Sequence, residues 1–174
     1  MTTPRTYPPA VADEATMLIA FLDHHRDTLR RQTEGLDARQ LATRLPPSTL
    51  TLGGLLKHLA FVEGFWCRYV LRGEEQHEPW ASVDWRADPD WEHHSAADDT
   101  PAQLRALLDA EVAAADAAIR AALAEDGVDT LAVRERHGQH PSLRWILNHL
   151  VAEYARHCGH ADLVRESVDG AVDL

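Results

Sequence analysis

Histidine and glutamate recur at intervals of four near the C-terminal end of the chain. His149, Glu153 and His157 follow one another at this spacing, and His160 comes three residues later. In an α-helix, residues three or four apart lie on adjacent turns of one face, where two side chains can hold the same metal ion. Residues eight apart are separated by about 12 Å along the axis, so His149 and His157 cannot do so. Three chelating pairs remain open: His149 with Glu153, Glu153 with His157, and His157 with His160.

The helical face that carries these groups is predicted to be buried. Ile146 and Val164 lie at the angular centre of the same stripe. The alternative is a charged face in contact with solvent, which would have placed polar residues above and below the histidines. Apolar residues interleaved with the polar ones therefore favour a buried polar site.

His58 is an isolated ionisable residue on an apolar face of another predicted helix, among Leu55, Val62 and Tyr69. A buried imidazole without a partner costs a few kcal/mol, so His58 needs either a neighbouring hydrogen-bonding side chain or a metal ion. Two histidines and one carboxylate would leave positions at the ion open to water or substrate, as catalytic sites do. Zinc suits such ligands best, and nickel, iron or manganese accept them as well.

Other residues near these faces are candidates for a substrate pocket or for proton transfer. His25 lies on the apolar side of the first predicted helix, so it could face the same cavity. His160, His149 or His25 could relay a proton. The predicted pocket residues are His25, Trp66, Tyr69 and Trp145.

The remaining histidines are expected to be solvated. His93 and His94 could chelate weakly with Asp90, but nothing apolar holds these residues together. The same expectation applies to His77, His137 and His140.

The amino-acid composition excludes several classes of protein. Asp and Glu number 28 against 17 Lys and Arg, and the resulting net charge of −11 would repel a nucleic-acid backbone. No segment approaches the roughly 18 apolar residues needed to cross a bilayer, and residues 1–10 lack the apolar stretch of a secretory signal. Cys67 and Cys158 are predicted to be buried apolar side chains that face away from the histidines. We therefore expect one cytoplasmic domain over residues 1–174, with residues 1–10 extended and with neither nucleic acid nor membrane as a partner.

Helical periodicity predicts the four elements that must position these residues. They cover about residues 11–33, 51–72, 100–125 and 142–166. Thr51 is suited to cap the second helix, and Thr100 with Gln103 matches a capping box at the start of the third. Four amphipathic helices of about 20 residues are enough for an all-α four-helix bundle.

A long connection, residues 74–99, separates the second and third predicted helices. It contains Trp80, Trp85 and Trp91, and a solvated loop rarely carries three tryptophans. We expect this segment to fold back over the bundle. It could act as a lid on a pocket, or the tryptophans could simply attach the loop to the bundle.

Two stretches resemble a known family. The run SLRWILNHLVAEYARHCGHADLVRESVDG, residues 142–170, resembles the signature of the mini-circle-type actinobacterial branch of the DinB/YfiT-like metal-binding four-helix superfamily. The run STLTLGGLLKHLAFVEGFW, residues 48–66, resembles its helix-two signature, and the DPDW sequence at residues 88–91 also fits.

This resemblance implies a DinB-like four-helix bundle with an unusual connection order, often dimeric. It also implies one metal ion held by a histidine of helix two and by two residues four apart on helix four. On this chain the implied ligands are His58, Glu153 and His157. A glutamate at the first helix-four position is similar to relatives of mycothiol-dependent maleylpyruvate isomerase, whose zinc ligands are two histidines and one glutamate. Those relatives carry an additional C-terminal domain for which a chain ending at Leu174 has no room, so isomerase activity is not expected.

The leading functional hypothesis is a divalent-metal-dependent transferase that joins a low-molecular-weight thiol to a small electrophile. The actinobacterial character of the branch makes mycothiol the expected thiol. A metal-dependent hydrolase that activates water is a second hypothesis, because the same ligands serve both reactions. The third is a non-catalytic helical module, possibly a homodimer, with a vacant or structural metal site.

Overall fold

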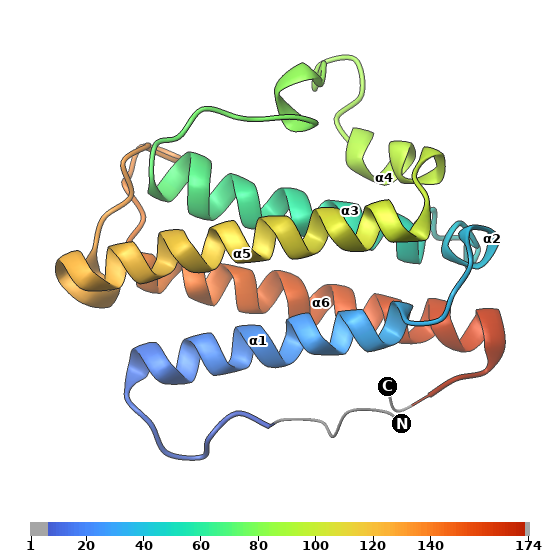
Figure 1. Cartoon of the computed structure of the whole chain (residues 1–174), viewed down its shortest axis with the longest axis horizontal. Coiled ribbons are helices and arrows are strands. Elements are labelled where there is room, and N and C mark those ends of the chain that lie inside the picture. The colour runs from blue at the N-terminus through green and yellow to red at the C-terminus, as the bar shows by residue number, and fades with distance from the viewer. Residues whose placement is uncertain (1–6, 173–174) are drawn as a thin grey trace.

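The computed structural model describes residues 7–172, in which four long helices lie side by side as a bundle (Figure 1). The predicted extended segment at residues 1–10 therefore falls partly outside the described residues. Between residues 7 and 172 there is no named strand, only two isolated bridges in the connection before the last helix. The all-α prediction is thus confirmed. The long helices are α1 (Glu14–Thr33), α3 (Leu52–Glu63), α5 (Pro101–Asp126) and α6 (Leu143–Asp169).

Side-chain caps fix where the long helices begin. The hydroxyls of Thr51, Thr100 and Ser142 accept hydrogen bonds from backbone N–H groups three residues later, at the starts of α3, α5 and α6. Thr100 and Gln103 form the predicted capping box. α1 begins later than expected, because the side chain of Asp13 caps it.

The second predicted helix is not uniform. At Gly64 the α-helical winding of α3 changes to a π-helix, η1 (Gly64–Leu71), which ends before Gly73 at a positive φ of 71°. A Cβ at Gly64 would lie 2.6 Å from Oε2 of Glu111 on α5. The absence of a side chain at Gly64 therefore lets α5 place a carboxylate against the backbone, at the point where the winding changes.

The direction of the helices explains the long connection. α1 and α6 run one way, whereas α3 and α5 both run the other way (Figure 1). Because α3 and α5 are parallel, the chain must return along the length of the bundle between them, as in bundles with a crossover connection. Residues 72–100, here called the crossover, make this return and carry η2 (Trp80–Ser82), α4 (Trp91–Ser95) and η3 (Ala96–Asp98). The shorter connections contain α2 (Ala38–Leu41) and η4 (Gly127–Asp129).

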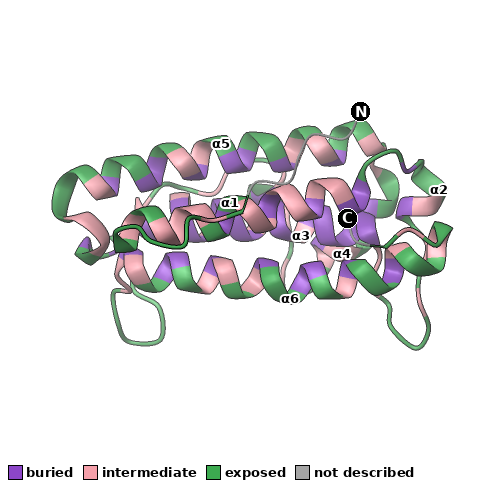
Figure 2. Ribbon diagram, turned by 90° about the horizontal axis from the view of Figure 1, so that it is seen from below, coloured by how far each residue is buried: buried purple, intermediate pink, exposed green. Residues whose placement is uncertain are grey.

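The core lies between the inward faces of the helices, which are buried while the outward faces are exposed (Figure 2). α1 packs against α6, and α3 packs against α5 and α6. Each fully buried leucine contributes about 1.5–3 kcal/mol by its removal from water. Fully buried apolar residues of the long helices include Leu22, Leu29, Leu55, Leu59, Ile146 and Leu150. None of the described helices is long and apolar enough to cross a membrane.

The three tryptophans attach the crossover to α3. Trp80 is buried, packs edge-on against Phe61 at 5.3 Å between ring centroids, and donates a hydrogen bond from Nε1 to Glu111. Trp85 also packs on Phe61, at 4.7 Å. Nζ of Lys57 lies 4.5 Å from the centroid of the Trp91 ring. These contacts favour the interpretation of the tryptophans as attachments of the loop.

Candidate metal centre

One histidine of α3 and two residues of α6 converge where these helices pack together. Oε2 of Glu153 lies 3.4 Å from Nε2 of His157 and 3.9 Å from Nε2 of His58. One ligand atom from each of the three residues lies within 4.8 Å of the others. Ligands of a tetrahedral zinc ion with bonds near 2.1 Å are roughly 3.4 Å apart. The three side chains are therefore spaced so that small rotations would let them share one ion.

The helices hold these side chains at a partly buried position. On α3, Leu55 and Leu59 flank His58 and are fully buried, and Leu150 of α6 is fully buried as well. The exposed fractions of the ligand-bearing side chains are 18% for His58, 20% for Glu153 and 11% for His157. A site of this kind is shielded by a packed core on one side and remains reachable from the other.

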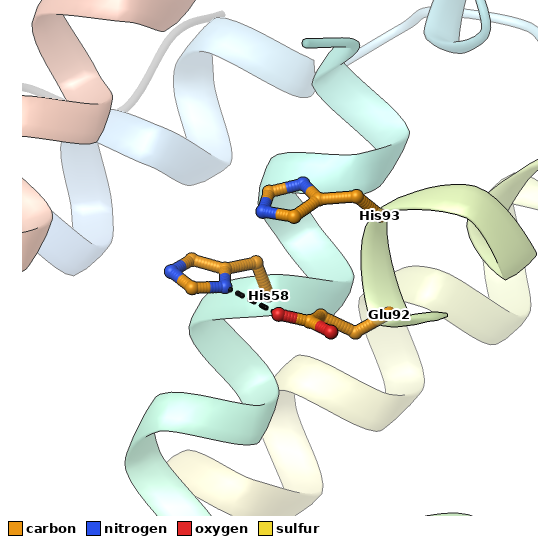
Figure 3. Close-up of side chains that lie close together, drawn as sticks. All are labelled: His58, Glu92 and His93. Carbon is orange, nitrogen blue, oxygen red and sulfur yellow. Dashed lines mark hydrogen bonds and ion pairs between the residues drawn. The ribbon is translucent and has the colours of Figure 1, made fainter. Parts of the chain in front are cut away.

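A hydrogen bond sets the orientation of His58. Its Nδ1 lies 2.9 Å from Oε1 of Glu92, which comes from α4 in the crossover (Figure 3). Burial alone would raise the pKa of Glu92, but the hydrogen bond and charge of His58 keep this pKa below its ordinary value. An ionised carboxylate can only accept, so Nδ1 of His58 donates this hydrogen bond, and in the neutral imidazole the lone pair is then on Nε2. Carboxylates commonly orient metal-binding histidines in this manner.

The electrostatic environment keeps His157 neutral. Burial, followed by the proximity of His58, His160 and His93, lowers the pKa of His157 to about 3. A neutral imidazole has a lone pair available for a cation, whereas a protonated one has none. His157 therefore offers a free lone pair at neutral pH.

A second group of possible ligands shares His58 with Glu92 and His93. The rings of His58 and His93 are stacked at 4.6 Å with an angle of 18° between their planes. Imidazole lone pairs lie in the ring plane, so an ion in the plane of one stacked ring lies well outside the plane of the other. The rings of His58 and His157 meet at 65°, which allows their lone pairs to converge. Geometry therefore favours the group with Glu153 and His157.

The other predicted catalytic histidines lie beside this cluster. Nδ1 of His160 is 3.4 Å from Nδ1 of His157. Nε2 of His149 is 3.9 Å from Oε1 of Glu153, and burial lowers the pKa of His149. Both histidines thus touch a residue of the cluster from neighbouring turns of α6.

Two of the predicted pocket residues form an aromatic surface with His149. Trp145 stacks on the His149 ring at 5.0 Å and 12°, and Trp66 packs against both, at 5.1 Å from Trp145 and 4.6 Å from His149. Trp66 is buried, while Trp145 is 48% exposed. About half of the Trp145 surface therefore remains in contact with solvent, on the side of His149 away from the cluster.

The two remaining pocket candidates are placed differently. His25 packs edge-on against His24, and its carbonyl accepts a contact from the thiol of Cys158. Tyr69 lies eleven residues beyond His58, where it stacks on Phe65 and has the guanidinium of Arg134 4.2 Å from its ring centroid. The angular position on a helical wheel grouped Tyr69 with His58, but the rise along the helix separates them.

The prediction that His93 is solvated is wrong, whereas His77 is partly exposed and contacts a buried carboxylate. His93 is half-buried against His58, with its Nδ1 shielded from solvent, and Nε2 of His77 is 2.6 Å from Oε1 of the buried Glu111. Trp91 directly precedes Glu92 and His93, and Trp80 shares the Glu111 carboxylate with His77. The tryptophans were therefore the signal in the sequence that could have identified these three residues as buried or partly buried. By contrast, His94, His137 and His140 are exposed as predicted.

Both cysteines are buried and free, as predicted. Burial raises the pKa of the Cys67 thiol and raises that of Cys158 to about 12. Neither side chain supplies a thiolate at neutral pH, so any reactive sulfur at this site has to come from a bound molecule.

The parallel pairing of α3 with α5, together with a His–Glu–His cluster between α3 and α6, defines a DinB-like helical bundle. Within this class, residues 17–170 match the family model described as MST, mycothiol-S-transferase. Because the match covers most of the sequence, the chain belongs to the mycothiol S-transferase family. Among curated proteins, none matches the sequence.

Proposed function

We propose that this protein is a divalent-metal-dependent transferase that joins a thiol of the mycothiol type to a small electrophilic acceptor. The observation that carries the proposal is the convergence of His58, Glu153 and His157 within 4.8 Å in a chain of the mycothiol S-transferase family. In this proposal Nε2 of each histidine and Oε2 of Glu153 hold the ion. Zinc is the proposed metal, because two histidines and one carboxylate form a common catalytic zinc set.

The charge of these ligands suits a thiolate. Two neutral imidazoles and one carboxylate leave a divalent cation with a net positive charge, which favours an anionic ligand at an open position. A bound cation of this kind lowers the pKa of a coordinating thiol, so that thiolate is present at neutral pH. A site with three carboxylates would have cancelled this charge.

The neighbouring histidines, His149 and His160, are proposed to accept the proton that the thiol loses. Burial lowers the pKa of His149, so this side chain is neutral at pH 7 and able to accept a proton from an incoming thiol. His160 has the same proposed role on the opposite side of the cluster, beside His157. Both act on the proton only, since the sulfur that attacks the acceptor belongs to the bound thiol.

The aromatic surface is proposed to hold the acceptor. Trp145 presents an open face, and Trp66 and His149 fix its orientation by their own ring contacts. A planar apolar acceptor would stack on the exposed part of the Trp145 indole, with His149 between it and Glu153. Such stacking typically contributes about 0.5–1.5 kcal/mol in addition to the burial of apolar area.

Elemental analysis and turnover of one set of variants test the proposal. Protein purified without added metal or a histidine tag should contain about one divalent ion per chain. It should also consume a model electrophile in the presence of mycothiol. His157→Ala should lose both the ion and the activity, whereas His94→Ala, at an exposed position on α4, should retain both. Equal rates in His157→Ala and the parent protein would end the proposal.

Two controls separate the alternative functions. Product formation that does not depend on the thiol would identify a hydrolase that activates water. Stoichiometric metal binding without turnover of any thiol and acceptor pair, but with a large fall in melting temperature on chelation, would identify a structural ion in a non-catalytic module.

A further inference from the structure

We propose that α4 is a positioning element for His58, in which Glu92 fixes the tautomer of the imidazole and His93 fixes the plane of its ring. This inference rests on the proposed function only in treating His58 as a metal ligand. The orientation itself is a property of the metal-free protein and can be measured there. The crossover thus contributes to the site without supplying a ligand.

Glu92 is built for this role. Its side chain is 6% exposed, and Oε1 lies 2.9 Å from Nδ1 of His58. A carboxylate that accepts this hydrogen bond holds the proton on Nδ1, which leaves the lone pair on Nε2 and directs it away from α4 (Figure 3). Nε2 is the atom that lies 3.9 Å from Glu153. Without Glu92, either nitrogen could carry the proton, and part of the population would present N–H to an incoming cation.

His93 acts on the other degree of freedom of the ring. It stacks on the face of His58, with 4.6 Å between centroids and 18° between planes, and so limits rotation about the second side-chain torsion.

The approach of α4 to α3 depends on a glycine. A Cβ at Gly54 would lie 3.0 Å from Oγ1 of the capping Thr51, and 3.1 Å from Nδ1 and 3.3 Å from the carbonyl oxygen of His93. All three distances are shorter than ordinary van der Waals contact, so a larger residue would press on His93 as well as on the cap. Gly54 sits one turn before His58 on the same helix, which aligns the gap with the ring that His93 covers.

Lys57, the only lysine of the chain, contacts both ends of the segment formed by α4 and η3. Its Nζ lies over the ring of Trp91, the first residue of α4, and donates a 2.5 Å hydrogen bond to Asp99, just after η3. Lys57 directly precedes His58. The turn of α3 that carries His58 therefore also fixes the position of α4, which contacts the His58 ring.

The first experiment reads the tautomer of His58 in metal-free protein by long-range ¹H–¹⁵N correlation spectra. The parent should show Nδ1–H. Glu92→Gln keeps an acceptor oxygen and should keep this tautomer, whereas Glu92→Leu should shift His58 to Nε2–H or to a mixture. Metal affinity, measured by competition with a chromophoric chelator, should fall about 10- to 100-fold in Glu92→Leu and less in Glu92→Gln.

A matched control is Glu111→Gln, which alters another buried carboxylate that anchors the crossover but lies away from His58. It should leave the His58 tautomer unchanged even if it lowers stability. If Glu92→Leu does not fold, Glu92→Gln and the Gly54 variant described next decide the question.

The second experiment displaces α4 without changing a polar group. Gly54→Ala should weaken metal affinity and broaden or shift the His58 ring signals, because its Cβ pushes against His93. Gly159→Ala is the control, since a Cβ at this helical position of α6 meets no atom within 4 Å. It should leave both measurements unchanged.

Two outcomes would overturn the inference. One is an unchanged His58 tautomer and metal affinity in Glu92→Leu together with unchanged affinity in Gly54→Ala. The other is two ions per chain in the parent and one in Glu92→Leu, because Glu92 would then be a ligand of a second ion. Absence of metal from the parent protein, with a tautomer that still depends on Glu92, would contradict the proposed function and leave the positioning of His58 intact.

Discussion

Arg26 of α1 and Glu63 of α3 form an ion pair with two hydrogen bonds at the centre of the bundle. The distances from Nε to Oε1 and from Nη2 to Oε2 are both 2.7 Å, and the side chains are 1% and 0% exposed. Nη1 of Arg26 also donates to Asp116 of α5, at 2.8 Å. Glu63 is the last residue of α3 before the winding changes to η1, so this pair connects three helices at that transition.

Breaking this pair should be costly because it leaves a charge without a partner in the core. Arg26→Met is expected to lower the free energy of unfolding by about 3–5 kcal/mol. The double variant Arg26→Met/Glu63→Leu should recover much of this loss. Urea denaturation measures both. A double variant no more stable than the single one would show that the uncompensated charge is not the cause.

The close approach of α5 to Gly64 should make this position intolerant of a side chain. In Gly64→Ala the new Cβ would meet Oε2 of Glu111, a carboxylate whose other oxygen, Oε1, is fixed by contacts with Trp80 and His77. We expect a loss of about 1–3 kcal/mol, despite the higher helix propensity of alanine. Gly159→Ala, where space is open, should instead gain about 0.5–1 kcal/mol. A gain in both variants, measured by thermal denaturation, would contradict this account.

Acid should destabilise the metal-free protein well above the pKa of its carboxylates. His157 has a pKa of about 3 in the folded state, against about 6.5 in the unfolded chain. Between these values His157 binds more protons in the unfolded chain than in the folded protein. The contribution of His157 to the free energy of unfolding is therefore complete above about pH 6.5 and is lost as the pH falls. One such residue contributes up to about 1.4 kcal/mol per pH unit. The lowered pKa values of His25, His93 and His149 act in the same direction.

This pH dependence can be assigned by substitution. In the presence of a chelator, His157→Gln should show a shallower decrease of the unfolding free energy between pH 6.5 and pH 4.5 than the parent. His94→Gln is the control, since the hydrogen bond that Nδ1 of His94 donates to Asp88 raises the pKa of His94, and its contribution therefore has the opposite sign. Identical slopes in the parent and His157→Gln would show that His157 is not responsible.

Loss of the open indole should affect the acceptor more than the thiol. Trp145→Ala is expected to raise the KM for a planar aromatic acceptor about 10-fold, from the loss of stacking energy, and to leave the KM for the thiol unchanged. Leu163→Ala, at another exposed apolar position of α6, should change neither constant. Steady-state kinetics with both substrates varied would show the difference, and equal effects on both KM values would argue against a separate acceptor surface.

Much of the bundle was predictable from local patterns. Thr51, Thr100 and Ser142 carry side-chain caps that act within three residues, so their sequence spacing is sufficient to place the starts of α3, α5 and α6. The change of winding at Gly64 was not predictable, because it coincides with an approach by Glu111, which is 47 positions away in the sequence.

The candidate site was predictable only in part. Spacing identified the polar stripe on α6, and the family resemblance selected Glu153 with His157 from the three possible pairs. Glu92 was not singled out and His93 was expected to be solvated, because their burial depends on contacts between α4 and α3 that involve Lys57 and Gly54. These contacts join segments more than 30 residues apart, and no periodicity within the crossover indicates them.

The crossover is needed because α3 and α5 are parallel, and it runs back along the outside of the four-helix core. Between Trp80 and Trp91 it runs largely over the surface, where residues can be inserted or exchanged at little cost to folding. Its far end nevertheless reaches His58. Substitutions in this peripheral segment could therefore change the reactivity of the site, while the packing of the helices that carry the proposed ligands stays the same.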